Sequence, residues 1–530
     1  MSQHALRQDQ FSTDSGLTRS LWMEVGNIRG CGPLTGDLRA EICIVGAGIA
    51  GLTVAYRLAS GGRKVVVLDD GMIGGGETCR TTAHLTNALD DRYLELERLH
   101  GQDGARLAAE SHTAAIQEIA RIVAEEHIDC DFERVDGYLF HPDGDSDHLF
   151  KELEAVRRAG LEEAELVARA PVESFDTGRA LRFPGQAQFH ALRYLQGLAH
   201  AVVRAGGSIF QGSHVTSVER GRPALVRTET AATVTADNVV MATNTPVIDR
   251  VAMHTKQAAY RTYAVAARIP EHSAPRLLLW DTLDPYHYVR RQSGTAGFDY
   301  LIVGGEDHRT GEPDETEKRH GRLIAWTRER FPQVRDFPYR WSGQIMEPVD
   351  ALAFIGLNPG DDNLFIATGD SGNGMTHGTI AGLLIPDLID GRSNPWAKLY
   401  HPSRKNIAAM GTFARENLKV AGHYADHLTG GDISEVTQLP AGEGAVLRHG
   451  LHKVAVYRDP AGALHTLSAI CPHLGCVVQW NGGEKTWDCP CHGSRFHALG
   501  HVVNGPANKD LGQAEAPSVR QAADGTGRRS

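Results

Sequence analysis

The stretch EICIVGAGIAGLTVAYRLASGGRKVVVLDD, residues 41–70, decides the fold of most of this chain. An apolar run at 41–45 predicts a buried strand, residues 48–60 predict a helix, and 64–68 predict a second, parallel strand. The first turn has the pattern G-x-G-x-x-G and an acid ends the second strand; these residues are Gly46, Gly48, Gly51 and Asp69. Glycine permits close approach of a pyrophosphate at a helix N-terminus, and the acid bonds a ribose hydroxyl. The stretch therefore predicts an α/β dinucleotide-binding fold, with a purely structural turn as the alternative.

Three later segments favour a flavin over a nicotinamide cofactor, which the glycine motif alone does not distinguish. A loop rich in Gly and Thr, GGGETCRTTAHLT at 74–86, follows the acidic strand and suits further phosphate and flavin contacts. Residues 237–244, DNVVMATN, predict a strand that ends in small polar residues. From 363, NLFIATGDSGNGMTHG predicts a strand, a glycine turn and a helix that begins near 375. The N-terminus of that helix would stabilise the negative charge of a reduced flavin.

Two short loops far downstream carry paired cysteines and histidines: CPHLGC at 471–476 and CPCHGSRF at 489–496. The first contains a C-x-H pair and the second a C-x-x-H pair; the four residues are Cys471, His473, Cys489 and His492. Two thiolates and two imidazoles can hold a 2Fe–2S cluster of the Rieske type, in which histidines replace two of the cysteines. A zinc site with the same ligands is the alternative. Zinc would not explain the second cysteine pair inside these loops or the Gly-Pro-Ala at 505–507.

The middle of the chain predicts an antiparallel sheet, because segments such as QAAYRTYAVAARI, YHYVRR and DYLIVGG alternate and are rich in aromatic residues. Side chains alternate along Tyr286-His287-Tyr288, so His287 faces away from both tyrosines while Arg290 shares their face. An arginine there could clamp a substrate carboxylate through two hydrogen bonds, with a structural ion pair as the alternative. The predicted catalytic residues are His287, Tyr288, Arg290 and His377; Arg261, Trp341 and Gln344 are further candidates for positioning substrate.

Composition excludes several classes of protein. The 530 residues are too many for one ordinary core and predict two or three domains. A net charge of −11 without a basic block argues against nucleic acid as a partner. There is no apolar run of about 18 residues, so no membrane span is expected. The polar start of the chain lacks an apolar signal core, which favours a cytoplasmic protein.

The segments 41–86, 214–244 and 340–390 resemble the D-amino-acid-oxidase-type family of FAD-dependent oxidoreductases, and the resemblance covers roughly 39–425. It implies that FAD is the cofactor. By this resemblance, the ADP half is held by Gly46, Gly48, Gly51, Asp69 and Val215, and the flavin side of the pyrophosphate by Gly76, Thr81 and Thr82. The residues expected along the isoalloxazine are Gly372, Gly374, Met375 and Thr376.

Some members of this family attach the flavin covalently through a histidine or a cysteine, which draws attention to His84 and Cys79. His84 lies a few residues from the position of such a histidine, which Arg80 occupies here. A non-covalently bound FAD is therefore expected.

The region 431–522 resembles the Rieske domains of cytochrome bc complexes and soluble Rieske ferredoxins. The resemblance implies that Cys471, His473, Cys489 and His492 are the cluster ligands and that Cys476 and Cys491 form a disulfide. Such a bond is unusual in the cytoplasm and requires shielding beside the cluster. The whole chain resembles bacterial fusion oxidoreductases that join the two parts in this order.

The expected architecture is a Rossmann-like α/β FAD-binding domain with an inserted antiparallel-sheet substrate domain (α+β), followed by an all-β Rieske domain. The predicted boundaries are a loose lead-in at 1–38, the oxidoreductase at 39–425, a linker at 426–435, the Rieske domain at 436–522 and a disordered tail at 523–530. Within the oxidoreductase, the FAD-binding segments are 39–135, 186–255 and 340–425, and the substrate sheet is 136–185 and 256–339.

A flavin accepts two electrons at once, whereas a Rieske cluster passes one at a time. The resemblance therefore implies a dehydrogenase for an amine, amino acid or N-methylated small molecule, whose electrons leave through the cluster to an external acceptor such as a protein carrier. An electron-transfer reductase module serving a separate oxygenase is the alternative, but it needs a nicotinamide site and no second G-x-G-x-x-G is present. A self-contained Rieske oxygenase would need a two-His-one-carboxylate iron site, and the sequence offers none with suitable spacing. A non-catalytic redox sensor is a further alternative.

Overall fold

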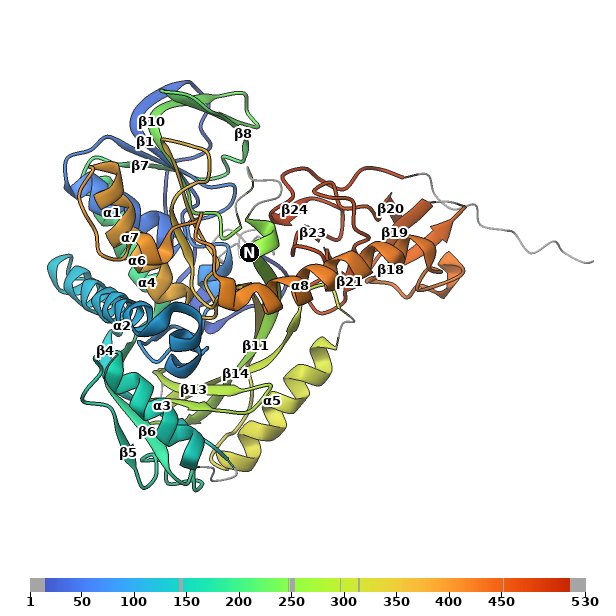
Figure 1. Ribbon diagram of the computed structural model, residues 1–530. Helices are drawn as coiled ribbons and strands as arrows, with labels where there is room; N and C mark the ends of the chain where they lie inside the picture. The colour runs from blue at the N-terminus through green and yellow to red at the C-terminus, as the bar shows by residue number, and fades with distance from the viewer. Residues whose placement is uncertain are drawn as a thin grey trace, which may run out of the picture.

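The computed structural model describes residues 15–142, 146–245, 247, 253–295, 297–312, 315–450 and 452–514, so the predicted tail at 523–530 lies outside the described residues. Three bodies are visible in Figure 1: a parallel sheet with its helices, an antiparallel sheet below it, and a C-terminal domain to the right. The strands of the parallel and antiparallel sheets alternate in blocks along the chain before residue 400. The C-terminal domain follows helix α8. This arrangement confirms the predicted architecture.

The first sheet has the order β16-β17-β10-β1-β2-β7, with β8 and β9 attached to β10. Its central strand β1 (Leu38–Val45) pairs in parallel with β2 and β10, and helix α1 (Ile49–Ser60) packs against α6 and α4. The remaining elements are β2 Val65–Leu68, β7 Ser208–Phe210, β8 Val215–Glu219, β9 Ala224–Thr228, β10 Thr233–Met241, β16 Phe354–Leu357, β17 Leu364–Thr368, α4 Ala191–Arg204 and α6 Gly374–Ile389. The nearly continuous apolar strand Val65–Leu68 is fully buried, as expected of a parallel sheet covered on both faces.

The second sheet is mostly antiparallel, with the order β15-β11-β14-β13-β12-β4-β6-β3 and β5 on β6. Its strands are β3 His84–Leu85, β4 Glu133–Phe140, β5 Glu165–Val167, β6 Ala180–Gln188, β11 Gln257–Pro270, β12 Leu277–Asp281, β13 His287–Ser293, β14 Phe298–Arg309 and β15 Tyr339–Pro348. Helices α3 Ser146–Arg158 and α5 Thr316–Arg330 pack on this sheet, and α2 Tyr93–Glu125 packs against α3 and α6. Residues 340–348 were predicted in the nucleotide-binding part. They belong to this sheet instead, because β15 pairs antiparallel with β11 along its whole length.

The C-terminal domain contains two antiparallel sheets, β18-β19-β20 and β21-β22-β23-β24. The strands are β18 Glu443–His449, β19 His452–Arg458, β20 Leu464–Ser468, β21 Gln479–Asn481, β22 Thr486–Asp488, β23 Arg495–His497 and β24 Val502–Asn504. The short helices of the chain are η2 Leu21–Val25, η3 Glu77–Arg80, η4 His254–Lys256, α7 Ala397–Tyr400, η5 Ile407–Ala409, η6 Tyr424–Leu428 and η7 Val436–Gln438.

Helix α8 (Met410–His423) runs from the oxidoreductase part to the C-terminal domain (Figure 1). The turn that follows it is anchored to the first cysteine–histidine loop. The Tyr424 hydroxyl donates to the Leu474 carbonyl at 2.8 Å, and a His427 ring nitrogen bonds the Gly475 carbonyl at 2.8 Å. The connection between the two parts is therefore helical from Ile407 to Leu428 and holds the loop in place.

The lead-in is not loose where the structure describes it. Trp22 is fully buried, and its indole N–H donates to the Thr81 carbonyl at 2.6 Å. The backbone N–H of Thr18 donates to the Glu484 carboxylate of the C-terminal domain at 2.9 Å. A large aromatic side chain gains a great deal of free energy on burial, which explains why this polar segment is ordered.

A buried ion cluster joins the C-terminal domain to the rest of the chain. The Glu484 carboxylate lies 3.2 Å from Arg80 and 3.3 Å from Arg261, and all three side chains are at most 1% exposed. Burial alone would raise the pKa of Glu484, but Arg80, Arg261 and Arg495 together lower it well below its usual range. Glu484 is therefore ionised at neutral pH, and its stabilising effect is lost only in strong acid.

We expect Glu484→Gln to destabilise the folded chain by about 3–5 kcal/mol, because it leaves buried arginines without their counter-charge. The free energy of unfolding, measured by chemical denaturation of the holoprotein, checks this. Glu443→Gln is the matched control: Glu443 pairs with Lys485 at 2.6 Å, but its side chain is 39% exposed. Such a pair is worth about 0–1 kcal/mol. Equal losses in the two variants would contradict the importance of the buried cluster.

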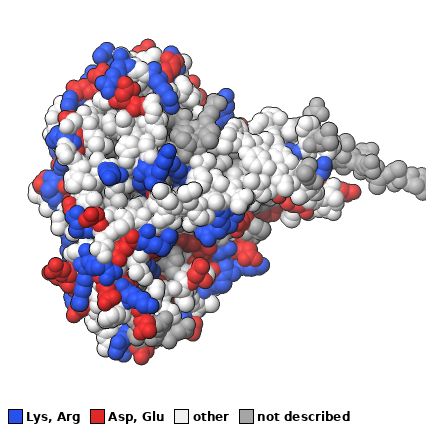
Figure 2. Space-filling model, in the orientation of Figure 1, with Lys and Arg blue, Asp and Glu red and all other residues white. Residues whose placement is uncertain are grey.

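On the face shown in Figure 2, Lys and Arg side chains are interspersed with Asp and Glu. The described residues form no continuous basic surface on this face. The C-terminal domain shows few charged side chains on this face. No described helix is both long enough and apolar enough to cross a membrane.

Candidate functional site

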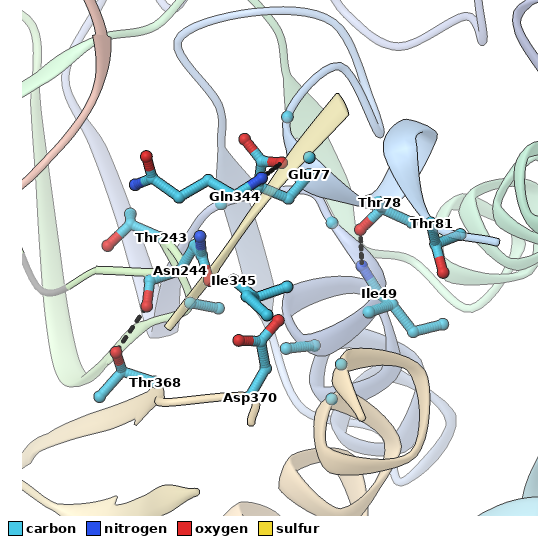
Figure 3. Close-up of a pocket in the computed structure, with 18 of the residues that line it drawn as sticks. Ile49, Glu77, Thr78, Thr81, Thr243, Asn244, Gln344, Ile345, Thr368 and Asp370 are labelled. Carbon is cyan, nitrogen blue, oxygen red and sulfur yellow. Dashed lines mark hydrogen bonds between the residues drawn. The ribbon is translucent and has the colours of Figure 1, made fainter. Parts of the chain in front are cut away.

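A cavity of about 300 Å³ lies where the two large sheets and the C-terminal domain meet. Most of the residues predicted to bind FAD line it. They are Gly46, Gly48, Asp69, Gly76, Thr81, Thr82, Val215, Gly372, Gly374 and Met375. Gly51 and Thr376 are not in its lining, and the predicted catalytic residues Tyr288 and His377 are. Figure 3 shows residues from distant parts of the chain, such as Ile49, Thr243 and Asp370, around the same space.

The glycine turn at one end of the cavity accepts no larger residue at two positions. Gly46 has φ +107°, and a Cβ there would lie 2.4 Å from the Ala242 carbonyl oxygen. A Cβ on Gly51 would lie 1.9 Å from the Gly46 carbonyl oxygen, so Gly51 serves the packing of helix α1 rather than the cavity. Asp69 fixes the turn because its carboxylate accepts hydrogen bonds from the N–H groups of Ala47 at 2.5 Å and Gly71 at 2.9 Å.

The polar groups that face the cavity fit a dinucleotide. Asn244 lines it from the end of β10, and its buried side-chain nitrogen has no hydrogen-bond partner among the described residues. Across the cavity in Figure 3, the Thr78 hydroxyl accepts the N–H of Ile49 at 3.2 Å, at the start of helix α1. An unpaired buried amide and a helix N-terminus that opens onto a glycine-lined space are features that phosphate and ribose oxygens satisfy.

His377 follows the turn that is expected to face the flavin, and both of its ring nitrogens contact other groups of the protein. Its Nδ1 bonds the Asp370 carbonyl at 2.8 Å, and its Nε2 lies 3.2 Å from Nε2 of His112. Burial lowers the pKa of His377 to about 4, so the ring is neutral. His112 also bonds the Thr376 hydroxyl at 2.8 Å, which turns Thr376 away from the cavity. His377 therefore has no free ring nitrogen for a substrate.

Two of the predicted catalytic residues lie away from the cavity. His287 bonds the Asp281 carboxylate at 2.8 Å and stacks on Trp326 at 4.6 Å, on the side of the sheet that α5 covers. This agrees with the alternation that places His287 opposite the tyrosines. Arg290 is 1% exposed and donates to the carbonyls of Ala83 and Phe189 at 2.9 and 3.0 Å. The structure does not bring either side chain into the cavity.

The other candidates have different surroundings. Tyr288 lines the cavity and shares a 2.8 Å hydrogen bond with the Thr262 hydroxyl. Trp341 is fully buried and donates to the Arg80 carbonyl at 2.8 Å, and Arg261 belongs to the ion cluster of Glu484. Gln344 lines the cavity, and its side-chain N–H donates to the Gly493 carbonyl of the second cysteine–histidine loop at 2.9 Å.

The two residues considered for covalent attachment of the flavin also differ in position. His84 lines the cavity and bonds the Thr82 hydroxyl at 3.1 Å. Cys79 is buried outside the lining, and its thiol faces the carbonyls of Gly75 and Gly76.

The two cysteine–histidine loops fold in the same way, which follows from their similar sequences. In the first, the N–H of Cys471 donates to the Cys476 carbonyl at 2.9 Å and the N–H of Gly475 to the Cys471 carbonyl at 3.0 Å. In the second, the corresponding bonds join Cys489 to Ser494 at 2.8 Å and Gly493 to Cys489 at 3.0 Å. Both glycines have φ near +80°, where a glycine is favoured.

The four predicted ligands come together between these loops. The buried thiols of Cys471 and Cys489 are hydrogen-bonded to each other, which lowers the pKa of Cys471. The His473 and His492 rings are 5.1 Å apart, and the buried Nδ1 of His492 has no partner among the described residues. A cluster with two cysteines on one iron and two histidines on the other fits this donor set.

Cys476 and Cys491 form a disulfide with their Cα atoms 6.4 Å apart, which confirms the prediction. The sulfur atoms of Cys476, Cys489 and Cys491 lie within 4.8 Å of one another. Two of these three are bonded together, so the trio cannot act as a metal site. The disulfide instead ties the two cluster loops to each other.

Some neighbours of the two sites were not predicted. The His254 ring from η4 lies 4.8 Å from that of His473 and 6.1 Å from that of His492. Asn504 lines the FAD cavity from the C-terminal domain and donates to the Glu77 carboxylate at 3.0 Å. No local sequence pattern signals these contacts, because they arise only where the domains dock.

Comparisons with known proteins agree with this geometry. The DAO family of FAD dependent oxidoreductases matches residues 41–388, and the Rieske [2Fe-2S] domain matches residues 431–517. YhfW of Bacillus subtilis (strain 168), which is named as a Rieske 2Fe-2S iron-sulfur protein, is 31% identical over 483 residues, covering 90% of this chain and 94% of that protein. Gamma-glutamylputrescine oxidoreductase of Escherichia coli (strain K12) is 27% identical over 386 residues, covering 69% of this chain and 88% of that protein.

Among solved structures, glycine oxidase from Geobacillus kaustophilus superposes with a TM-score of 0.60 at 18% identity, covering 69% of this chain and 99% of that structure. This likeness shows the fold of the oxidoreductase part. The two family matches identify FAD and a Rieske 2Fe–2S cluster as the cofactors. The chain belongs to the DAO family of FAD-dependent oxidoreductases and carries a Rieske [2Fe–2S] domain at its C-terminal end.

Proposed function

We propose that this protein oxidises an amine-type small molecule at FAD and delivers the electrons through its own Rieske cluster to an external acceptor. One observation carries this proposal: the loop that holds Cys489 and His492 closes on the FAD cavity of the same chain at Gln344. FAD supplies a two-electron acceptor when bound, and the cluster a one-electron carrier. The names of the relatives, an oxidoreductase and an oxidase for amine-bearing compounds, support an amine as donor.

The residues around Gln344 would hold the two cofactor sites at a constant separation. Gln344 is 1% exposed, and its backbone N–H donates to the Glu77 carboxylate at 2.7 Å. Figure 3 shows Gln344 beside Glu77. Glu77 also accepts from Asn504 at 3.0 Å. One short set of hydrogen bonds therefore connects the flavin-facing strand β15, the pyrophosphate loop and the Rieske domain. A docked domain of this kind favours transfer within one chain.

The direct test is anaerobic reduction of the holoprotein by small amines, with flavin absorbance and the electron paramagnetic resonance signal of the cluster recorded together. The proposal expects flavin bleaching followed by the signal of the reduced cluster, at a rate that does not depend on protein concentration. Reduction by NAD(P)H and by no amine would overturn it and favour a reductase module. A cluster that stays oxidised beside a reduced flavin would overturn the proposed electron route.

We expect Gln344→Leu to slow the reduction of the cluster after the flavin has been reduced. The variant removes the hydrogen bond to Gly493, and an unsatisfied buried carbonyl costs about 1–3 kcal/mol. The loop beside His492 should therefore loosen. Stopped-flow absorbance separates the two reduction steps, and the temperature at which the cluster is lost reports the loosening independently.

Gln333→Leu is the matched control for this variant. Gln333 also donates to a backbone carbonyl, that of Ser273 at 3.0 Å, but this bond is exposed and remote from the cavity. The control should reduce its cluster at the wild-type rate. A Gln344→Leu protein with wild-type cluster reduction and wild-type cluster stability would show that Gln344 has no part in the connection.

A further inference from the structure

We propose that the substrate binds as an amine cation between Asp90 and a group of aromatic rings, and that the site rejects amines that carry an α-carboxylate. This inference rests on the proposed function and names its substrate class. It follows from three features of the cavity: its aromatic wall, its unpaired carboxylate and its lack of an available cation.

The aromatic wall lies on the side of the cavity formed by the antiparallel sheet. Four rings that line the cavity follow one another: Trp280, His84, Tyr288 and Tyr286. The His84 ring is 6.1 Å from Trp280 and 5.6 Å from Tyr288, and the two tyrosine rings are 5.6 Å apart. Aromatic faces attract ammonium groups that have left water. Burial lowers the pKa of His84 to about 3, so this ring adds no positive charge.

Asp90 provides the charge that an ammonium group needs. It lines the cavity, and the Tyr286 hydroxyl donates to its carboxylate at 3.2 Å. It takes part in no ion pair within the described ranges. Burial raises the pKa of Asp90 and the charge of Arg92 partly opposes this, but the Arg92 guanidinium donates to the carbonyls of Leu89 at 3.1 Å and Asp281 at 3.4 Å. A half-buried carboxylate that forms no ion pair with a described residue favours a charged ligand that supplies the partner.

The flavin-facing turn is shaped to leave room for this carboxylate. A Cβ on Gly372 would lie 2.1 Å from an Asp90 carboxylate oxygen, so only glycine at 372 leaves Asp90 in this place. The oxygen therefore lies against the turn expected to border the isoalloxazine. A substrate nitrogen held by Asp90 would therefore lie beside this turn.

Among the described residues that line the cavity, each basic side chain that could bind a substrate carboxylate already has an acidic partner; His214, for example, lies 3.5 Å from Asp70. Arg80 is the only lysine or arginine among the described residues that line the cavity, and its side chain is 0% exposed and paired with Glu484 at 3.2 Å. Arg290, predicted as a carboxylate clamp, donates instead to backbone carbonyls outside the lining. Asp370 is a further acidic side chain in the cavity lining (Figure 3). Burial raises the pKa of Asp370 to about 7. A carboxylate ligand would therefore meet acidic groups and no free cation among the described lining residues.

The test uses two pairs of compounds that differ only by the α-carboxylate: butylamine against norvaline, and 1,4-diaminobutane against ornithine. Each is titrated anaerobically into the holoprotein, and both the shift of the flavin absorbance on binding and the rate of its bleaching are recorded. We expect the amines to bind and to bleach the flavin. The amino acids should bind at least about tenfold more weakly, because their α-carboxylate leaves water without gaining a positively charged partner.

Asp90→Asn should weaken amine binding by about 10- to 100-fold, because a charge-assisted hydrogen bond is lost. It should not weaken norvaline binding, because the repulsion is removed as well. Asp103→Asn is the control: Asp103 is 97% exposed on α2, and the variant should bind both classes as the wild type does. Equal weakening of both classes by Asp90→Asn, or tighter binding of the amino acids by the wild type, would overturn the inference.

The two proposals fail in different ways. Amines that shift the flavin absorbance through Asp90 without bleaching it would support the cation site and contradict the oxidation. Amino acids that bleach the flavin faster than the amines would support the oxidation and contradict the cation site. Absence of binding by all four compounds would overturn the cation site.

Discussion

A Gly48→Val protein is expected to fold with its Rieske cluster and to contain almost no FAD. Gly48 lines the cavity at the start of helix α1 and has φ −80°, a conformation that valine adopts without strain. Its Cβ would lie 3.0 Å from the Thr78 hydroxyl and meet no backbone atom. The added methyl groups would therefore occupy the space that the pyrophosphate needs, and the fold around them would stay intact.

Flavin content per chain after denaturation, together with the iron content of the same sample, measures this effect. Gly321→Val is the matched control, because Gly321 is exposed on α5 and a Cβ there meets nothing within 4 Å. The control should retain FAD at the wild-type level. A Gly48→Val protein that is purified with a full complement of flavin would contradict the assignment of this cavity to FAD.

Cys489→Ser should have an effect of similar size on the other cofactor: loss of the Rieske cluster with FAD retained. Cys489 is a buried free cysteine, as is Cys471, and the same loop contributes His492. A serine hydroxyl is a far poorer ligand for iron than a thiolate. The disulfide from Cys491 to Cys476 is expected to keep the loops together, so the FAD cavity should remain closed.

Electron paramagnetic resonance of the dithionite-reduced protein and its iron content check this expectation, with flavin content as the internal reference. Cys31→Ser is the control, because Cys31 is a free thiol far along the chain from the cluster loops. It is exposed. A Rieske signal in Cys489→Ser would refute the ligand assignment. Loss of both flavin and cluster would show that the FAD-binding part needs the cluster of the Rieske domain in order to retain its own cofactor.

The nucleotide-binding turn and the cluster loops could be predicted because their chemistry is local in the sequence. Gly46 needs a positive φ within one turn, and Cys489 and His492 reach the same cluster because two residues separate them. The disulfide between Cys476 and Cys491 likewise joins these two local motifs. Each of these features depends on a few consecutive residues, and the structure places them as expected.

The roles of single residues in the antiparallel sheet were harder to predict, because alternation gives the face of a side chain and not its neighbours. Tyr288 and Arg290 share a face, yet Tyr288 lines the cavity while Arg290 lies beneath it, 5.4 Å from the ring of Trp22. The segment with Trp22 was predicted to be loose, so nothing indicated that it would cover this arginine. The strand β15 was assigned to the wrong sheet for the same reason, since its partner β11 is far away in sequence.

The sequence by itself determined which cofactors the chain can hold, because glycine turns and ligand pairs act over a few residues. Only the tertiary structure decided how the two cofactor sites are related and what charge the substrate site presents. Gln344 and Gly493 are 149 positions apart, and Arg80 and Glu484 are 404 apart. Such contacts depend on the docking of whole surfaces, where burial and charge pairing across the interface outweigh any local preference. The glycine motif at 41–70 therefore predicts a dinucleotide, and the docked domains place a Rieske loop beside its cavity, where Asp90 forms no ion pair with a described residue.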